Sequence, residues 1–212
     1  MSGQDAAAAV AHYATHSGAL RSRYDGRPSG AWFASVRKLI PSAPCRTADI
    51  GAATGRDARW FADLGHAVTA VEPVAAFLEP ARSADDRVTW LEDALPGLPR
   101  LVASGAQFDL IALSAVWHHL APGERPRAAA ALAGLVAPCG RILIALRHGP
   151  VPQGMPVHAV DEQETAAEFA ARGLAEVFRC PADPVGSSER AAGISWTWLA
   201  LQAAGGERCA TE

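Results

Sequence analysis

Three acidic residues, Asp49, Glu72 and Asp93, lie at the ends of three successive short apolar segments, with a helix-forming segment between one and the next. Where helices join parallel strands, the carboxyl ends of the strands meet at one edge of the sheet, and ligands bind there. The spacing therefore predicts three carboxylates around one small-molecule site. Each acid alone has a simpler interpretation, as a solvated strand-end carboxylate, a turn acid or a helix cap.

A turn containing two glycines follows the first of these acids. Gly51 and Gly55 would let the backbone come within contact distance of a bound molecule, since a side chain there would block it. A dinucleotide-binding fingerprint would place glycine at positions 51, 53 and 56, but Ala53 and Arg56 occupy two of them. By itself the segment also fits an ordinary tight turn or another kind of nucleotide site.

Glu72, followed by Pro73, comes about twenty residues after this turn. In doubly wound folds an acid at that distance lies at the end of the adjacent strand and can accept hydrogen bonds from both hydroxyls of a ribose. The spacing thus indicates a ligand with a ribose.

His118 and His119 are the only adjacent pair of near-neutral titrating groups in the chain. One of them, with His118 slightly favoured, is a candidate base that removes or orients a substrate proton. The alternative is that both pack or cap the following helix. Trp117, His118 and His119 cannot all point into one site, because successive residues of a helix fan out by ~100°.

These residues need a framework of alternating strands and helices, and the hydrophobic periodicity predicts one. The predicted strands are residues 45–48, 66–73, 87–91, 107–114, 141–146, 174–180 and 195–201, and the predicted helices after residue 50 are 58–64, 74–84, 124–136 and 162–172. The polar segment 181–192 is predicted to be a loop, and so is segment 151–156 over the site. A helix over 2–16, ended by Gly18, and helical spacing over 32–40 precede the first strand.

Length and composition limit the classes of protein. The chain has 212 residues, half of them apolar, which suits one domain with a sizeable core. A net charge of −3 without a basic run disfavours nucleic acid as a partner. The four cysteines form no CxxC pair and no secretory signal is evident, so reduced thiols and a cytoplasmic location are expected. No apolar run reaches the ~20 residues of a membrane helix.

The spacing Asp49-x-Gly51-x-Ala53-x-Gly55, with the acids that follow, resembles motif I of the class I S-adenosylmethionine-dependent methyltransferases. The resemblance covers about Ala48 to Leu146. It implies a Rossmann-like α/β fold, with a seven-stranded, mostly parallel sheet flanked by helices and an antiparallel last strand. We expect one domain over residues 1–204, with a helical lid at 1–40 and a catalytic core at 45–204, and a disordered tail at 205–212.

The resemblance also implies roles at the cofactor site. Asp49 would order the turn, the backbone of the turn would face the methionine part of S-adenosylmethionine, and Glu72 would accept the ribose hydroxyls. Asp93 and the backbone of Ala94 would bind the adenine, and Ser114 would contact the cofactor. The expected cofactor-binding residues are Asp49, Gly51, Ala52, Ala53, Gly55, Glu72, Pro73, Asp93, Ala94 and Ser114.

The acceptor side is predicted less specifically. Tyr13, Tyr24 or a nearby arginine would contact the cofactor's carboxylate or the acceptor, and Trp117 and Arg147 are further substrate candidates, although Arg147 could equally pair with a surface acid. Trp196 and Trp198 share one face of the last strand, as core residues or with one of them lining the acceptor pocket.

The residues after the fourth predicted strand narrow the acceptor. Ser114-Ala115-Val116-Trp117 stands where nucleic-acid and glutamine N-methylating enzymes carry an Asn/Asp-Pro-Pro-Tyr/Phe motif, which disfavours those acceptors. No Asp, Glu and His set at metal-like spacing follows this strand, so no metal is expected.

The resulting hypothesis is metal-independent, in-line methyl transfer from S-adenosylmethionine to O, N or S of a small metabolite. Two alternatives stay open: cyclisation of the cofactor on a protein of the same fold, which would release methylthioadenosine, and a cofactor-binding module without turnover. The sequence does not specify an oligomeric state.

Overall fold

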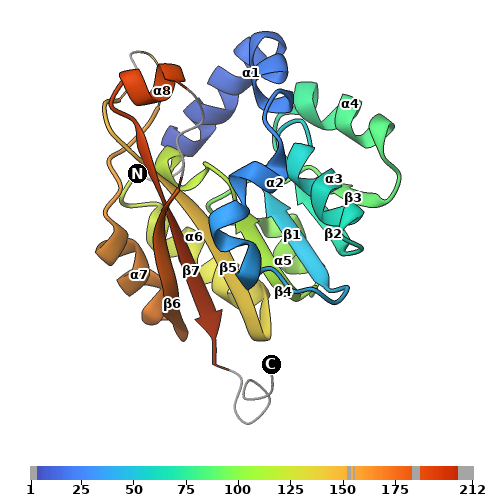
Figure 1. Ribbon diagram of the computed structural model, residues 1–212, viewed down its shortest axis with the longest axis vertical. Helices are drawn as coiled ribbons and strands as arrows, with labels where there is room; N and C mark the ends of the chain where they lie inside the picture. Colours follow the sequence, from blue (N-terminus) through green and yellow to red (C-terminus); the bar gives the residue numbers. More distant parts are fainter. Residues whose placement is uncertain (1–3, 152–153, 155, 183–186, 205–212) are drawn as a thin grey trace.

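The computed structural model describes residues 4–151, 154, 156–182 and 187–204, so the predicted tail at 205–212 lies outside the described residues. Its centre is a seven-stranded sheet in the order β3-β2-β1-β4-β5-β7-β6 (Figure 1). The strands are β1 (Arg46–Ile50), β2 (Ala67–Val71), β3 (Val88–Leu91), β4 (Phe108–Leu113), β5 (Val136–His148), β6 (Leu174–Ala182) and β7 (Ser195–Ala203).

Parallel pairing joins β3, β2, β1, β4 and β5, whereas β7 is antiparallel to both β5 and β6. The predicted fold, a mostly parallel seven-stranded sheet with an antiparallel last strand, is therefore confirmed. The chain winds outward in opposite directions from β1 and β4, and such a reversal opens a crevice at the carboxyl ends of the two strands.

Helices cover both faces of the sheet. The helical elements are α1 (Gln4–Asp25), α2 (Ser29–Trp32), the 3-10 helix η1 (Ala34–Leu39), α3 (Arg56–Asp63), α4 (Ala75–Ala84), α5 (Pro99–Ala103), the 3-10 helix η2 (Trp117–His119), α6 (Arg125–Leu135), α7 (Glu162–Ala170) and α8 (Ser187–Ala191).

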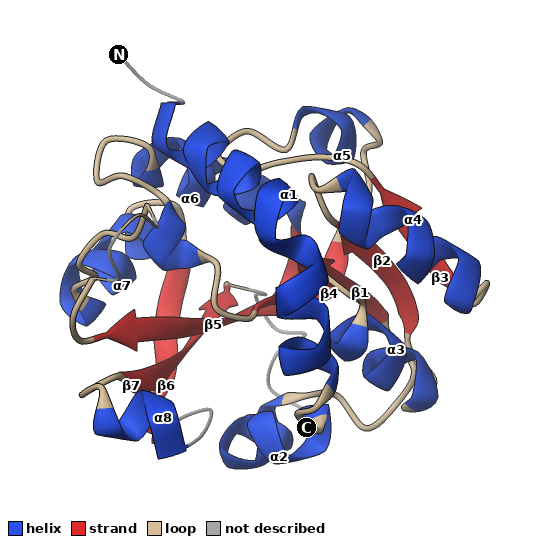
Figure 2. Ribbon diagram, turned by 90° about the horizontal axis from the view of Figure 1, so that it is seen from above, coloured by secondary structure: helices blue, strands red, loops and turns tan. Residues whose placement is uncertain are grey.

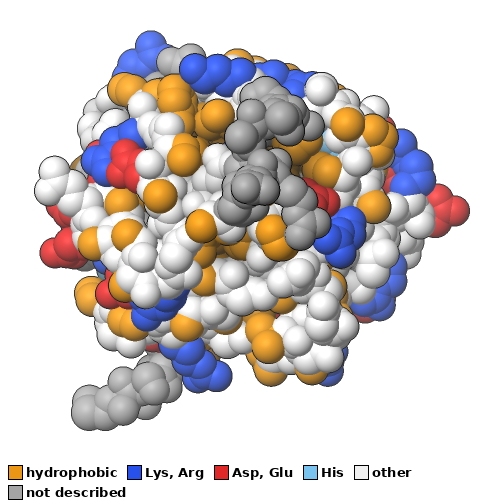
Figure 3. Space-filling view, turned by 90° about the horizontal axis from the view of Figure 1, so that it is seen from below, with side chains coloured by type: hydrophobic (Ala, Val, Ile, Leu, Met, Phe, Trp, Pro, Cys, Tyr) orange, Lys and Arg blue, Asp and Glu red, His pale blue; other side chains and the backbone are white. Residues whose placement is uncertain are grey.

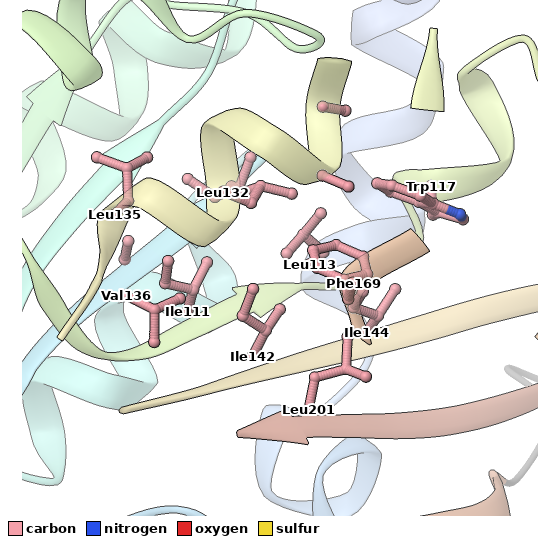
Figure 4. Close-up of a cluster of buried hydrophobic side chains, with 14 of the residues drawn as sticks. Ile111, Leu113, Trp117, Leu132, Leu135, Val136, Ile142, Ile144, Phe169 and Leu201 are labelled. Carbon is pink, nitrogen blue, oxygen red and sulfur yellow. The ribbon is translucent and has the colours of Figure 1, made fainter. Parts of the chain in front are cut away.

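The central strands are buried on both faces, as their near-continuous apolar sequences predict. In β5, Ile142 and Ile144 belong to the core beneath α5, α6 and α7, whereas Leu143 and Ala145 belong to the core beneath α2, η1 and α3. Figure 4 shows the first of these clusters, which fixes the strands that carry the site.

Two predicted boundaries were wrong, and two short helices were not predicted. The first helix continues through Gly18 to Asp25, because contacts of Arg21 and Tyr24 with α4 outweigh the cost of about 1 kcal/mol for an exposed glycine in a helix. Strand β5 begins at Val136 rather than at Arg141, across a register shift opposite β4. The short helices α5 and α8 were not predicted; α8 lies within the segment 181–192 that was predicted to be a loop.

The longest helix, α1, crosses over the edge of the sheet where the parallel strands end (Figure 2). The opposite side of the molecule, seen from below, carries Lys and Arg side chains mainly at its rim among the residues drawn in colour (Figure 3). Within the described part of the chain, no helix has the length and apolar character to cross a membrane. Cys45 and Cys180 are free, whereas Cys139 is disulfide-bonded, so the prediction of reduced thiols is wrong for Cys139.

Candidate active site

A cavity of about 390 Å³ is lined by residues at the carboxyl ends of β1, β2 and β4 and by apolar residues of α1. Its volume is within the range of about 300–1,000 Å³ that is usual for small-molecule sites. The turns after β1, β2 and β3 line one end, and residues of η2, β5, α8 and β7 line the other. The predicted cofactor residues other than Gly55 and Ser114 lie at the first end.

Asp49 is the most enclosed acid of the cavity. Its side chain is 1 % exposed, and its Oδ2 atom has no hydrogen-bond partner among the described residues. Burial raises the pKa of this carboxyl well above its ordinary value; nearby Asp57 and Glu72 raise it further, and Arg56 opposes the shift. A buried acceptor without a partner costs free energy, so a ligand or water that donates a hydrogen bond there would be favoured.

Glu72 lies at the end of β2 and accepts two backbone hydrogen bonds. Its Oε2 atom accepts from Ala53 N at 2.7 Å, and its Oε1 atom accepts from Val74 N at 2.8 Å. Burial raises the pKa of Glu72 to about 7, although both amides act in the opposite direction. A carboxylate oxygen has two lone pairs, so each can accept a further hydrogen bond from a ligand in the cavity.

Asp93 lines the cavity, but in this structure it also caps a helix. Its Oδ2 atom accepts from Arg100 N and Leu101 N, both at 2.9 Å, in the first turn of α5. Its Oδ1 atom accepts from Ala94 N at 2.9 Å. The simpler interpretation of this acid, a helix cap, is therefore observed, and a ligand would have to replace the Ala94 hydrogen bond to use that amide.

The glycine turn has left-handed backbone at Gly51, with φ of 76°, and at Gly55, with φ of 78°. A Cβ atom on Gly51 would lie 2.5 Å from Val116 Cγ2, and one on Gly55 would lie 2.2 Å from the Trp90 ring. The absence of a side chain at these two glycines therefore makes room for the side chains of Val116 and Trp90. Gly55 is not among the residues that line the cavity. Gly51, Ala52 and Ala53 do line the cavity, and Ala53 is also left-handed, with φ of 47°.

Behind the turn is an ion pair that the sequence analysis did not find. Arg56 donates to both carboxylate oxygens of Asp57 at 2.7 Å each, and Ser29 Oγ donates to Asp57 Oδ1 at 2.6 Å. Arg56 and Asp57 both line the cavity. The adjacent opposite charges of Arg56 and Asp57 at the start of α3 could have indicated this ion pair from the sequence. Their partner Ser29 lies on α2, too far away in the sequence to be predicted.

Ser114 holds an aromatic wall in place. Trp32 Nε1 donates to Ser114 Oγ at 2.7 Å, and the Trp32 ring contacts Trp196 at 5.5 Å between centroids. The guanidinium of Arg27 lies 3.6 Å from the centre of the Trp32 ring, a cation–π contact. All four residues line the cavity, whereas Trp198 is fully buried in the core.

The two histidines lie in η2 and differ in their surroundings. His119 Nδ1 is 2.8 Å from the Pro156 carbonyl, and its Nε2 is 3.0 Å from Tyr13 Oη. A carbonyl only accepts, so Nδ1 carries the hydrogen, and Nε2 of the neutral ring accepts the Tyr13 hydroxyl. His118 is 3 % exposed, and its Nδ1 is enclosed without a partner among the described residues.

Both histidines are weak bases in this environment. The pKa of His118 is held well below its ordinary value, mainly by burial and then by His119, Arg147 and Arg125. Burial also lowers the pKa of His119; Arg147 adds to the effect, and the Pro156 carbonyl opposes it. Both rings are therefore neutral near pH 7.

Arg147 lies at the end of β5, is 8 % exposed and lines the cavity. It donates from Nη2 to the Pro150 carbonyl at 2.9 Å. Burial lowers its pKa, and the negative potentials of Glu189 and Tyr13 oppose that change. Glu189, on the unpredicted helix α8, also lines the cavity and was missed as a site residue.

The structure does not bring every predicted residue to the cavity. Trp117 is fully buried, its ring centroid lies 5.4 Å from that of Phe169 (Figure 4), and it is not among the residues that line the cavity. Tyr24 lines the cavity beside Phe77, and Pro73 lines it next to Glu72. The predicted residues that line it are Tyr13, Tyr24, Asp49, Gly51, Ala52, Ala53, Glu72, Pro73, Asp93, Ala94, Ser114, His118, His119 and Arg147.

Comparison with known proteins agrees with this architecture. Residues 48–140 match the family described as a methyltransferase domain. The 1,6-didemethyltoxoflavin-N1-methyltransferase of Burkholderia thailandensis, solved with 1,6-didemethyltoxoflavin and S-adenosylhomocysteine, is 22% identical, with a TM-score of 0.69 over 94% of this chain and 88% of that one. The N-methyltransferase NodS of Bradyrhizobium japonicum, solved with S-adenosylhomocysteine, is 14% identical, with a TM-score of 0.62 over 87% of each chain. No curated protein matches.

Sheet order and cavity position define the class I methyltransferase architecture. Residues 48–140 thus resemble a methyltransferase domain, and the chain has the fold of the class I S-adenosylmethionine-dependent methyltransferases, as the motif at Asp49 to Gly55 predicted.

Proposed function

We propose that this enzyme binds S-adenosylmethionine in the cavity and transfers its methyl group to an O, N or S atom of a small molecule, without a metal. The observation that carries the proposal is the convergence of Asp49, Glu72 and Asp93, from the ends of three strands, on one cavity beside the glycine turn. A group of three or more His, Cys, Asp or Glu side chains suited to a metal ion is absent from the described residues.

The residues at this end fit the cofactor because they present hydrogen-bond acceptors to a ligand rich in donors. Glu72 would accept the ribose hydroxyls, Asp93 would accept the adenine amino group, and the unpartnered Oδ2 of Asp49 would accept a donor from the methionine part or from a water beside it. When bound, the cofactor supplies a methyl group on a cationic sulfur that an in-line nucleophile can displace, so positioning and exclusion of water provide most of the catalysis.

The structure favours His119 over His118 as the base, acting through Tyr13. Tyr13 Oη lines the cavity and already donates its proton toward His119 Nε2. A protonated acceptor would give its proton to Tyr13 Oη while the Tyr13 proton moves to His119 Nε2. The resulting imidazolium would keep its Nδ1 hydrogen bond to the Pro156 carbonyl, which stabilises the positive ring.

Calorimetric titration with S-adenosylmethionine and S-adenosylhomocysteine tests the cofactor site. Micromolar binding by the wild type should be lost in Glu72→Ala and retained in Glu79→Ala, which changes an exposed acid of α4. Absence of binding to the wild type would refute the proposal. After long incubation, methylthioadenosine as the main product in place of S-adenosylhomocysteine would indicate cyclisation of the cofactor.

A further inference from the structure

A continuous series of aromatic rings forms the wall of the cavity. Each ring contacts the next, with centroid distances of 5.5, 5.7, 4.2, 5.2, 6.5 and 6.1 Å along the series Trp32, Trp196, His118, His119, Tyr13, Phe77 and Tyr24. All seven side chains line the cavity, although they come from α2, β7, η2, α1 and α4. A wall of this kind favours a flat ligand with a π system, because stacked and edge-to-face ring pairs attract each other beyond the burial of their area.

The charges at this part of the wall favour an anion. Arg147 is a buried cation there, and its positive potential reaches His118, His119 and Tyr13. Arg27, stacked on Trp32, adds a second positive charge, while Glu189 supplies the negative one that faces Arg147. An aliphatic amine would arrive as a cation and would be repelled by Arg147.

The bases at the wall are also too weak to deprotonate an ordinary amine or alcohol. Both histidines are neutral and desolvated, and the arginine near them disfavours a positive ring. A substrate proton that passes to such a base must already be acidic, as a phenol O–H or a ring N–H is. The same guanidinium that weakens the histidines would stabilise the anion that remains on the substrate.

We infer that the acceptor is a planar aromatic or heteroaromatic molecule with an acidic ring N–H or O–H, bound against the Trp196–His118 wall with its anionic edge toward Arg147. This inference rests on the proposed methyl transfer, since it names the acceptor class of the same site. In the transfer, the acidic proton leaves to Tyr13 and on to His119, and the lone pair left on the ring N or O forms the new bond to carbon as the carbon–sulfur bond breaks.

The test uses 4-nitrophenol as the probe, because its phenolate absorbs visible light and the ionisation of the bound molecule can be read directly. The full-length protein, with and without S-adenosylhomocysteine, is titrated with 4-nitrophenol across pH. The wild type should lower the pKa of bound 4-nitrophenol by about one unit, which is the low end of the effect of an opposite charge within ~4–6 Å.

Variants separate charge from folding. Arg147→Gln should abolish the pKa shift and weaken phenolate binding about tenfold, whereas Arg147→Lys, which keeps the charge, should retain most of the shift. Arg82→Gln changes an exposed arginine of α4 and serves as the matched control. Circular dichroism confirms that each variant is folded.

Two comparisons between probes test the need for an aromatic ring and the sign of the charge. Cyclohexanecarboxylate should bind at least about tenfold more weakly than benzoate, and 4-nitrobenzylamine should bind more weakly than 4-nitrophenol. Equal binding of the two carboxylates, preference for the amine, or failure of 4-nitrophenol to bind at millimolar concentration would overturn the inference. If S-adenosylhomocysteine binds and 4-nitrophenol does not, only the acceptor class is refuted; if the reverse holds, the proposed cofactor is refuted and an aromatic-anion site remains.

Discussion

Glu72 should make binding of the adenosine part of the cofactor depend on pH near neutrality. In the free protein, burial raises the pKa of this carboxyl to about 7, so near pH 6 it is mostly protonated and near pH 8 mostly ionised. Hydroxyl groups that donate to Glu72 favour its ionised form. Binding must therefore release the proton, and affinity must fall as the pH drops through 7.

The magnitude follows from the titration curve. If the complex requires ionised Glu72, about nine tenths of the protein is competent one pH unit above the pKa and about one tenth is competent one unit below it. The affinity should thus weaken about tenfold from pH 8 to pH 6, which corresponds to about 1.4 kcal/mol. Burial holds the pKa of His118 well below its ordinary value and lowers that of His119, so both histidines favour the neutral form.

Methylthioadenosine is the suitable probe, because it carries the adenosine but no amino-acid group that titrates. Calorimetry at pH 6, 7 and 8, in two buffers of different ionisation enthalpy, gives both the affinity and the number of protons released. Glu72→Gln should bind weakly at every pH, and Asp49→Asn should keep the pH dependence if Glu72 is its source. A wild-type affinity that is flat between pH 6 and pH 8 would refute the reasoning.

Three further predictions concern the turn and Tyr13. In urea unfolding, Gly51→Ala should lower the free energy of unfolding by about 1–3 kcal/mol more than Gly105→Ala does. Both glycines have left-handed backbone, but only a methyl group at position 51 would clash with a side chain, that of Val116. Equal losses of unfolding free energy in the two variants would contradict the clash. Ala53→Gly should raise the melting temperature by a few degrees, because it removes the cost of about 1–2 kcal/mol for an alanine with left-handed backbone. The control Ala52→Gly should lower the melting temperature. A lower melting temperature for Ala53→Gly would argue against backbone strain at this position. The Tyr24→Phe variant leaves Tyr13 as the only tyrosine, so its phenol pKa can be measured by ultraviolet titration. Adding Arg147→Gln to this variant should raise the phenol pKa of Tyr13, whereas adding Arg82→Gln should not. An unchanged pKa in the Arg147→Gln double variant would exclude the Arg147–Tyr13 interaction.

The sheet and the position of the acids at its edge could be predicted from the sequence. The apolar strands, the turn at Gly51 and the spacing to Glu72 are local patterns, and parallel pairing then dictates that the strand ends meet. The cavity position and most of its cofactor side follow from this geometry. Gly55 shows the limit, because its lack of a side chain makes room for Trp90, which only the folded structure brings there.

The acceptor side could not be predicted at the same level, because its residues come from elements distant in the sequence. The Trp32 contacts with Ser114 and Trp196 join α2, the end of β4 and β7. Trp117 was expected at the site but packs against Phe169, since η2 turns the neighbouring histidines toward the cavity and leaves this ring to the core. The partner of Asp57, Ser29, is likewise set by packing rather than by any local pattern.

The strand order places Arg147 apart from the strand-end acids of the cavity. Asp49 lies in β1 and Glu72 directly follows β2, whereas Arg147 lies near the end of β5, where Glu189 faces it. Under the two proposals, a cationic donor would meet the acids and an anionic aromatic acceptor would meet the arginine. Transfer of a methyl group from a cation to an anion leaves two products without those charges. Each end of the cavity would then hold its product less tightly than its substrate, which favours release after the reaction.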